Sequence, residues 1–144
     1  MAGLWLFKTE PSEYSYDRLE KEKRAVWDGV TNALALKHLR QVRAGDRILF
    51  YHTGGERAAV AVARAASDPY PDPQDRAGKL VVVEVAPERR LDRPVALAEI
   101  KARRDMAGFD LVRLGRLSVM PVSPERWEAI LEMSRRKASA RTGR

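Results

Sequence analysis

The sequence predicts an α+β fold in a single domain, with short helices around a small closed or half-closed β-barrel. Three observations lead to this fold class. Strand-like and helix-like segments alternate along the 144 residues, no repeated strand–helix–strand unit occurs, and neither an internal repeat nor a shift in composition divides the chain. A chain of this length buries roughly two thirds of its unfolded surface, so its core needs no disulfide or metal.

The first strand and the first helix are predicted close to the N-terminus. Large apolar residues lie on both faces across residues 4–9, which is typical of a strand buried on both sides. Pro11 ends this strand because proline cannot donate to a hydrogen-bond ladder. Ser15 is an N-cap residue, and the helix that it begins is expected over residues 16–23.

A short extended segment and a second helix follow. Residues 24–29 read as a short extended segment that a glycine ends. Asn32 is a suitable N-cap for the next helix, expected over residues 33–42. Its alanine, leucine and valine side chains recur at the spacing of one helical face.

Three longer strands are predicted in the middle of the chain. Residues 47–53 are rich in branched and aromatic side chains, and a glycine pair connects them to a second strand over 58–66. In that strand valines alternate with alanines, so one face carries small side chains that allow another element to pack closely against it. The prolines of the loop over 67–78 exclude it from any central strand. Residues 80–90 are the most strongly strand-like segment.

The C-terminal part combines a weak pattern with a clear helix. A short helix is expected over residues 96–105, followed by an irregular stretch with at most short strands at 111–113 and 117–120. The last helix is marked by Ser123 at the N-cap and Pro124 at the first helical position, ahead of an apolar stripe.

The composition excludes several kinds of chemistry. Cysteine is absent and only two histidines occur, His38 and His52, so disulfides, thiolate catalysis and multi-histidine or cysteine metal centres are not expected. No sequence signature of a nucleotide-binding loop, a serine hydrolase or a zinc protease is present. A lone histidine at a strand end, such as His52, is more often structural than catalytic. The sequence therefore predicts no cofactor and no metal.

The net charge of +7 is uneven along the chain. Residues 135–144 hold five basic residues and no acid, which leaves 22 basic and 20 acidic residues in the rest of the chain. Such a tail is typical of a disordered end that attracts phosphates without sequence preference. The chain has no apolar run of about 18 residues and no secretory signal at its start. We expect a soluble, cytoplasmic monomer with no membrane segment.

The three tryptophans differ in their surroundings. Trp5 lies in an apolar strand and Trp127 on the inward stripe of the last helix, so both are expected in the core. Trp27 instead precedes Asp28 and Gly29. Glycine permits unusual backbone and close approach of a ligand, and stacking a base on an aromatic ring is worth about 1–3 kcal/mol. From these residues alone, Trp27 is either a core residue or the wall of a pocket.

Four motifs together resemble the EVE domain family. They are WLFKTEPSEYS, WDGVTN, GDRILFYHT and RLSVMPVSPERWEAIL, and the similarity runs from about residue 4 to residue 133. This family belongs to the PUA-like superfamily and is related in fold to the YTH readers of methylated RNA. The resemblance implies a PUA-like mixed β-barrel flanked by short helices over residues 1–134, followed by the basic tail over 135–144.

The resemblance also implies a pocket for one nucleobase. Eukaryotic relatives, the thymocyte nuclear protein group, are associated with modified cytosines in DNA, and bacterial members with modified bases. By similarity, FKTEP and WDGVTN form the pocket walls, FYHT closes another side and GRLS approaches it. The implied base-binding residues are Lys8, Thr9, Glu10, Trp27, Asp28, Gly29, Val30, Asn32, Tyr51, His52, Arg116, Leu117 and Ser118.

One position departs from the family pattern. Thr31 stands where family members commonly show an arginine, so a cation that could pair with a phosphate or a ligand edge is missing. Trp27 itself is kept, and the resemblance favours its interpretation as a pocket wall.

The expected function is a non-catalytic nucleic-acid-binding module that reads a modified base, first of all a modified cytosine in DNA, in an aromatic pocket. An RNA-binding PUA-like module linked to RNA modification is the alternative. A small enzyme acting on modified nucleosides would need a pocket residue with a shifted pKa, for which Lys8 and His52 are the candidates. An interaction protein with a vestigial pocket is the remaining hypothesis.

Overall fold

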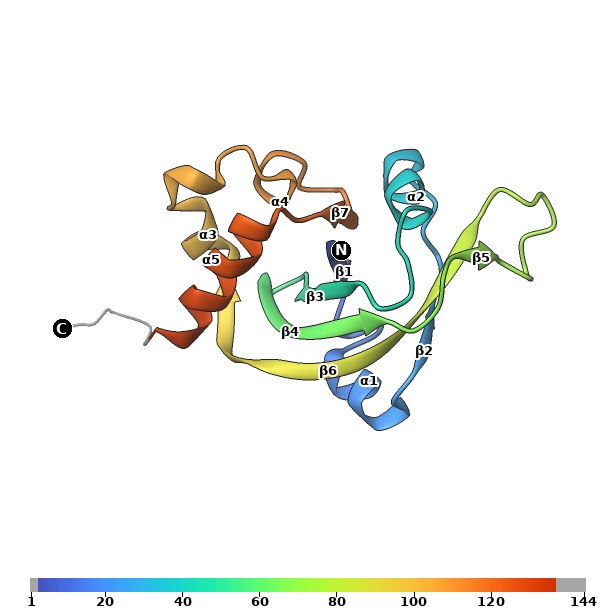
Figure 1. Ribbon diagram of the computed structural model, residues 1–144, viewed down its shortest axis with the longest axis horizontal. Helices are drawn as coiled ribbons and strands as arrows, with labels where there is room; N and C mark the ends of the chain where they lie inside the picture. The colour runs from blue at the N-terminus through green and yellow to red at the C-terminus, as the bar shows by residue number, and fades with distance from the viewer. Residues whose placement is uncertain (1–2, 137–144) are drawn as a thin grey trace.

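The structure is a computed structural model in which residues 3–136 are described, and they form one curled, mixed β-sheet with short helices around it (Figure 1). Strands β1 and β3 run parallel, and the other strand pairs are antiparallel. In spatial order the strands are β2 (Ala25–Trp27), β6 (Val81–Ala96), β4 (Ala58–Ala65), β3 (Arg47–His52), β1 (Leu4–Thr9) and β7 (Val119–Pro121), with β5 (Tyr70–Pro71) also paired to β6. The predicted α+β, PUA-like half-barrel is confirmed.

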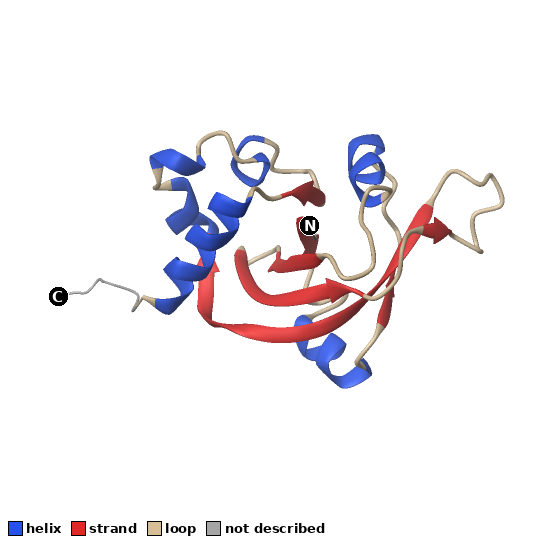
Figure 2. Cartoon of the chain, in the orientation of Figure 1, coloured by secondary structure: helices blue, strands red, loops and turns tan. Residues whose placement is uncertain are grey.

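The long strand β6 carries the curl of the sheet. Its first part pairs with β2 and most of its length with β4, and Figure 2 shows it bending beneath the other strands. Register shifts at Phe50/Tyr51 and at Val62/Ala63 are β-bulges, which bend strands and increase their twist. Because β2 and β7 end the strand order, the barrel stays open between β2 on one side and β1 with β7 on the other. We call this opening the seam.

Short helices lie around the half-barrel. They are α1 (Tyr16–Glu22), α2 (Ala33–Leu39), α3 (Leu97–Lys101), α4 (Asp110–Arg113) and α5 (Pro124–Arg135), with a 3₁₀ turn over Arg104–Met106. All three predicted N-caps are confirmed, since the side chains of Ser15, Asn32 and Ser123 each accept a backbone N–H three residues on. In Figure 1, α3, α4 and α5 gather at one end of the molecule, and the loop after β5 projects from the other.

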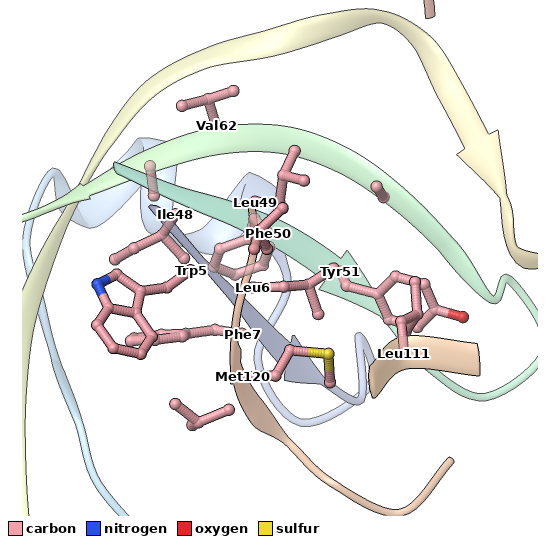
Figure 3. Close-up of a cluster of buried hydrophobic side chains, with 14 of the residues drawn as sticks. Trp5, Leu6, Phe7, Ile48, Leu49, Phe50, Tyr51, Val62, Leu111 and Met120 are labelled. Carbon is pink, nitrogen blue, oxygen red and sulfur yellow. The ribbon is translucent and has the colours of Figure 1, made fainter. Parts of the chain in front are cut away.

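The core lies inside the curl. Figure 3 shows side chains of β1 and β3 packed together with Met120 of β7 and Leu111 of α4. Trp5 and Trp127 are 7 % and 2 % exposed, which confirms both as core residues. Strand β4 contributes small side chains that let its neighbours approach closely, and they are all buried: Ala58, Ala59, Ala61, Ala63 and Ala65.

One buried carboxylate fastens the start of β1 to the turn before β3. Asp46 is 5 % exposed, and one of its oxygens accepts the N–H of Gly3 at 2.7 Å. Its other oxygen accepts the indole N–H of Trp5 and the backbone N–H of Arg43, both at 2.9 Å. A buried charge is tolerated when it is hydrogen-bonded in this way. The carboxylate therefore orders two segments that are distant in sequence.

Two predicted segments have a different structure. Residues 111–113, predicted as a short strand, form helix α4, in which Arg113 donates its backbone N–H to the Phe109 carbonyl at 3.0 Å. Residues 96–105, predicted as one helix, form the shorter α3 and then the 3₁₀ turn. Both segments are short, and an apolar pair such as Leu111 and Val112 fits a strand and a helical turn equally well.

Other boundaries differ in length rather than in type. The strand predicted over 80–90 continues to Ala96, and the strand predicted at 117–120 is β7 at Val119–Pro121. Helix α5 extends to Arg135, one residue into the predicted tail, while residues 137–144 of that tail lie outside the described residues. Within residues 3–136, no helix has the length and apolar character needed to cross a membrane.

Candidate functional site

A cavity of about 790 Å³ opens at the seam of the half-barrel. Its walls come from the end of β1, the loop and helix that follow, strand β2 with the loop after it, and the residue before β7. The volume lies within the range of about 300–1,000 Å³ that is typical of small-ligand sites. The lining residues are Lys8, Thr9, Glu10, Glu13, Tyr14, Arg18, Glu22, Arg24, Ala25, Val26, Trp27, Asp28, Gly29, Val30 and Ser118.

Trp27 is a core residue and a cavity wall at once. Its ring centroid lies 5.3 Å from that of Phe7 and 5.5 Å from that of Phe50, so it spans the seam from β2 to β1 and β3. Tyr14 meets it edge to face, with centroids 6.3 Å apart and an interplanar angle of 86°. The Trp27 side chain is 9 % exposed, and its indole N–H forms no hydrogen bond with any residue from 3 to 136. The two interpretations of this tryptophan are therefore compatible.

Tyr14 is held in place by a charged pair on α1. Its hydroxyl donates to one oxygen of Glu22 at 2.8 Å, while Arg18 donates to the other at 3.0 Å. The Arg18 guanidinium also lies 4.9 Å from the centroid of the Tyr14 ring. Burial and the bond to Glu22 raise the pKa of Tyr14 to about 12, and the bonds from Tyr14 and Arg18 lower the pKa of Glu22. The phenol thus stays protonated and its ring is fixed beside Trp27.

Lys8 and Glu10 bring opposite charges to the cavity. The Lys8 ammonium donates to the Gly115 carbonyl at 2.8 Å, and burial lowers the pKa of this lysine. One Glu10 oxygen accepts the N–H and the hydroxyl of Ser12, each at 3.3 Å. An ammonium has three donors and a carboxylate about four acceptor positions. Both groups therefore keep hydrogen-bonding capacity for a ligand.

The loop after β2 presents polar groups beside Trp27. Gly29 has φ +76°, and a Cβ there would meet nothing within 4 Å, so the glycine is required by the backbone conformation rather than by space. Asp28 is exposed and forms no hydrogen bond or ion pair within residues 3–136. Val30 is 7 % exposed and anchors the loop in the core. The Asp28 carboxylate is free to accept a hydrogen bond from a ligand.

The structure brings together eight of the residues that the resemblance assigned to base binding: Lys8, Thr9, Glu10, Trp27, Asp28, Gly29, Val30 and Ser118. The other five lie around neighbouring hollows. Tyr51 lines a hollow of about 260 Å³ that shares Lys8 with the seam cavity. Asn32, Arg116 and Leu117 line a third hollow, which shares Gly115 with that of Tyr51. The base-binding role of all these residues stays a prediction.

His52 lies outside the seam cavity, next to Glu56. Successive strand residues point to opposite faces, and Tyr51 and His52 line different hollows. The Nε2 atom of His52 accepts the backbone N–H of Tyr16 at 3.1 Å, which requires this nitrogen to be unprotonated. Its Nδ1 therefore carries the hydrogen and donates to Glu56 at 2.8 Å. The Nε2 bond holds the start of α1 against β3, and the Nδ1 bond ties β3 to the loop that follows it.

Several cavity residues were not singled out from the sequence: Glu13, Tyr14, Arg18, Glu22, Arg24, Ala25 and Val26. One signal for them existed, because Arg18 and Glu22 are spaced to pair on one helical face, with an aromatic residue just before the helix cap. Among residues 3–136, no group of three or more His, Asp or Glu side chains is arranged to hold a metal ion.

A curled PUA-like half-barrel with a cavity at its seam is the class of protein that these features define. The chain matches the EVE domain model over residues 3–133, and it belongs to the EVE domain family. It is 24% identical to human thymocyte nuclear protein 1 over 173 residues, which span 96% of this chain and 77% of that protein.

Solved structures share the fold. An NMR structure of a protein from Rhodopseudomonas palustris is 36% identical, with a TM-score of 0.88 over 92% of this chain and 93% of that chain. A crystal structure of human THYN1 protein in complex with 5-methylcytosine-containing DNA has a TM-score of 0.88 at 24% identity, covering 94% of this chain and 99% of that chain.

Proposed function

We propose that this protein is a non-catalytic nucleic-acid-binding module that takes one modified base, a modified cytosine of DNA, into the seam cavity. The observation that carries the proposal is the pair of rings in the cavity wall, Trp27 and Tyr14, whose planes stand at 86°. A planar base laid on the face of one ring meets the edge of the other. Stacking of this kind contributes about 1–3 kcal/mol per base, without regard to sequence.

The polar groups of the cavity suit a cytosine. Its exocyclic amino group is a hydrogen-bond donor, for which carboxylates are the usual protein partners. Glu10 and Asp28 both present carboxylates in the cavity wall. Val26, which is 49 % exposed on β2, supplies apolar surface in the same cavity for a methyl group on the base. Base identity and modification would thus be read by different side chains.

The relatives support a nucleic-acid ligand. Human THYN1 protein, which shares the fold, has been solved in complex with 5-methylcytosine-containing DNA. The structural match covers 94% of this chain and 99% of the THYN1 chain. Binding without catalysis is supported by the two candidate catalytic residues. The Lys8 ammonium is bound to a backbone carbonyl, and His52 lies outside the cavity with both nitrogens hydrogen-bonded.

Replacing Tyr14 with alanine is expected to weaken binding of a modified strand about ten- to a hundredfold, because one stacking surface is lost. The measurement is fluorescence anisotropy of a labelled single-stranded DNA with one central 5-methylcytosine. Tyr14→Phe keeps the ring and removes only the hydroxyl that bonds Glu22, so it should bind within about threefold of the wild type. Thermal unfolding shows whether both variants are folded.

The same titration separates the ligand classes. Strands with unmodified cytosine, hydroxymethylcytosine or methyladenine, and RNA with methylcytosine, are the comparison ligands. Preference for a modified cytosine in DNA, lost in Tyr14→Ala, supports the proposal. Equal affinity for modified and unmodified strands contradicts it, and a preference for the RNA strand favours the RNA-binding alternative.

A further inference from the structure

A hollow of about 260 Å³ lies beside the seam cavity and shares Lys8 with it. Its lining includes three cations, Lys8, Arg57 and Lys101, and no acidic residue. Arg57 and Lys101 are exposed and form no ion pair with any of residues 3–136. We call this the cationic hollow. Its charge is the opposite of that of a nucleic-acid backbone.

Most acids on the segments around the cationic hollow are already neutralised. Three of them pair with another cation within 3.0 Å: Glu99 with Arg93, Asp105 with Arg103, and Asp110 with Arg113. The fourth, Glu56, accepts the Nδ1–H of the neutral His52 at 2.8 Å and lines a different hollow.

One further acid approaches the hollow from the seam cavity. A Cβ on Gly54, which lines the hollow, would lie 2.5 Å from a Glu10 carboxylate oxygen. Even with this carboxylate counted, three cations face one acid, and the hollow keeps an excess of positive charge.

A buried hydroxyl without a partner also belongs to this hollow. Tyr51 is 2 % exposed, and its hydroxyl forms no hydrogen bond with any described residue. Most buried polar groups in proteins are hydrogen-bonded, so an unpaired one calls for an explanation. Burial raises the pKa of Tyr51, which keeps the hydroxyl a donor at neutral pH. Figure 3 shows the Tyr51 ring reaching toward Leu111, another residue of the hollow.

The backbone holds Arg57 in an unusual position. It has φ 45°, a conformation that costs energy for a residue other than glycine and that occurs often at functional sites. Its carbonyl accepts the N–H of Leu97 at 2.8 Å, which ties it to the start of α3, the helix that carries Lys101. The two cations are therefore placed on segments that are joined to each other.

We propose that the cationic hollow binds one phosphodiester of the strand whose base enters the seam cavity, with Arg57, Lys101 and the Tyr51 hydroxyl as its donors. The inference rests on the proposed function for the position of that base. Lys8 lies between the two sites, where its ammonium is 5.7 Å from the centroid of the Tyr51 ring. Binding of this phosphate would add affinity that does not depend on the modification of the base.

The test compares two double variants with the same loss of charge. Arg57→Asn/Lys101→Gln removes the free cations of the hollow, and asparagine tolerates the backbone conformation at position 57. Arg76→Asn/Lys79→Gln removes two exposed cations near the loop after β5, at the other end of the molecule from α3 (Figure 1). The ligands are the single-stranded DNAs with 5-methylcytosine and with unmodified cytosine.

The hollow variant is expected to bind both strands about tenfold more weakly, with their affinity ratio unchanged. The slope of its log affinity against log salt concentration should fall by about 0.7, as for one lost phosphate contact on a single strand. The control variant should change affinity by less than about threefold. Equal weakening by the two variants would mean that only overall charge matters, and it would overturn the proposal.

A strand with one neutral methylphosphonate next to the modified base gives a second readout. It should bind the wild type more weakly than the natural strand does, while the hollow variant shows no difference between them, because the contact is already lost. Equal losses in both proteins would contradict the assignment. If the wild type does not distinguish modified from unmodified strands, the proposed function fails, and these comparisons still decide whether the hollow binds phosphate.

Discussion

Replacing Trp27 with alanine is expected to lower the free energy of unfolding by about 4 kcal/mol, in addition to removing a wall of the seam cavity. The ring is 9 % exposed and packs between Phe7 and Phe50, with centroids 5.3 and 5.5 Å away. Its removal leaves a void where β2 meets β1 and β3 across the seam. Urea denaturation followed by far-ultraviolet circular dichroism measures the loss.

Trp27→Phe is the matched control for this variant. A phenyl ring keeps most of the contact with Phe7 and Phe50, so we expect it to lose less than half as much stability as the alanine variant. A loss below about 1 kcal/mol for Trp27→Ala would show that the tryptophan contributes little to the core. The expected instability is also the reason why Tyr14, at the rim, is the better position for testing binding.

Replacing Asp46 with alanine is expected to cost about 3 kcal/mol of stability. Its carboxylate accepts three hydrogen bonds, from the indole of Trp5 and from the backbone N–H groups of Gly3 and Arg43. Alanine leaves these donors unpaired in a largely buried place, where each costs more than a hydrogen bond gains. The same denaturation experiment gives the magnitude.

Asp46→Asn distinguishes the hydrogen bonds from the volume of the side chain. The amide keeps one acceptor oxygen and turns the other position into a donor, so its stability should lie between those of the wild type and the alanine variant. An asparagine variant as stable as the wild type would contradict the role given to the second oxygen, which serves Trp5 and Arg43.

Much of the fold could be predicted because its local signals agree with its packing. The N-caps at Ser15, Asn32 and Ser123 each mark a helix start. The end of β6 could not be predicted in the same way. Proline ordinarily ends a strand, and the strand was predicted to end at residue 90, but β6 passes through Pro94 to Ala96, with a register shift against β4 between Arg90 and Val95. The bulge that accommodates a proline depends on the neighbouring strand, which is distant in sequence.

The candidate site was predictable only in part, for a related reason. The motif around Trp27 and the one around Lys8 marked two walls of the cavity, and they meet because β2 and β1 face each other across the seam. The third wall comes from α1. Its sequence pattern indicates that a leucine faces the core, but it does not indicate which segment lies against the outer face of the helix. Tyr14 and Glu22 become cavity residues through the position of β2, which no local pattern specifies.

The most direct test of the central claim is a proton–nitrogen NMR titration of the indole groups with the 5-methylcytosine strand. Three indole resonances are expected, from Trp5, Trp27 and Trp127, and single Trp→Phe variants assign them. The Trp5 indole is bonded to Asp46, whereas that of Trp27 has no partner within residues 3–136. If a base enters the seam cavity, the Trp27 resonance shifts strongly and saturates with binding, while the other two stay nearly constant. Saturable binding that leaves the Trp27 resonance in place would contradict the account.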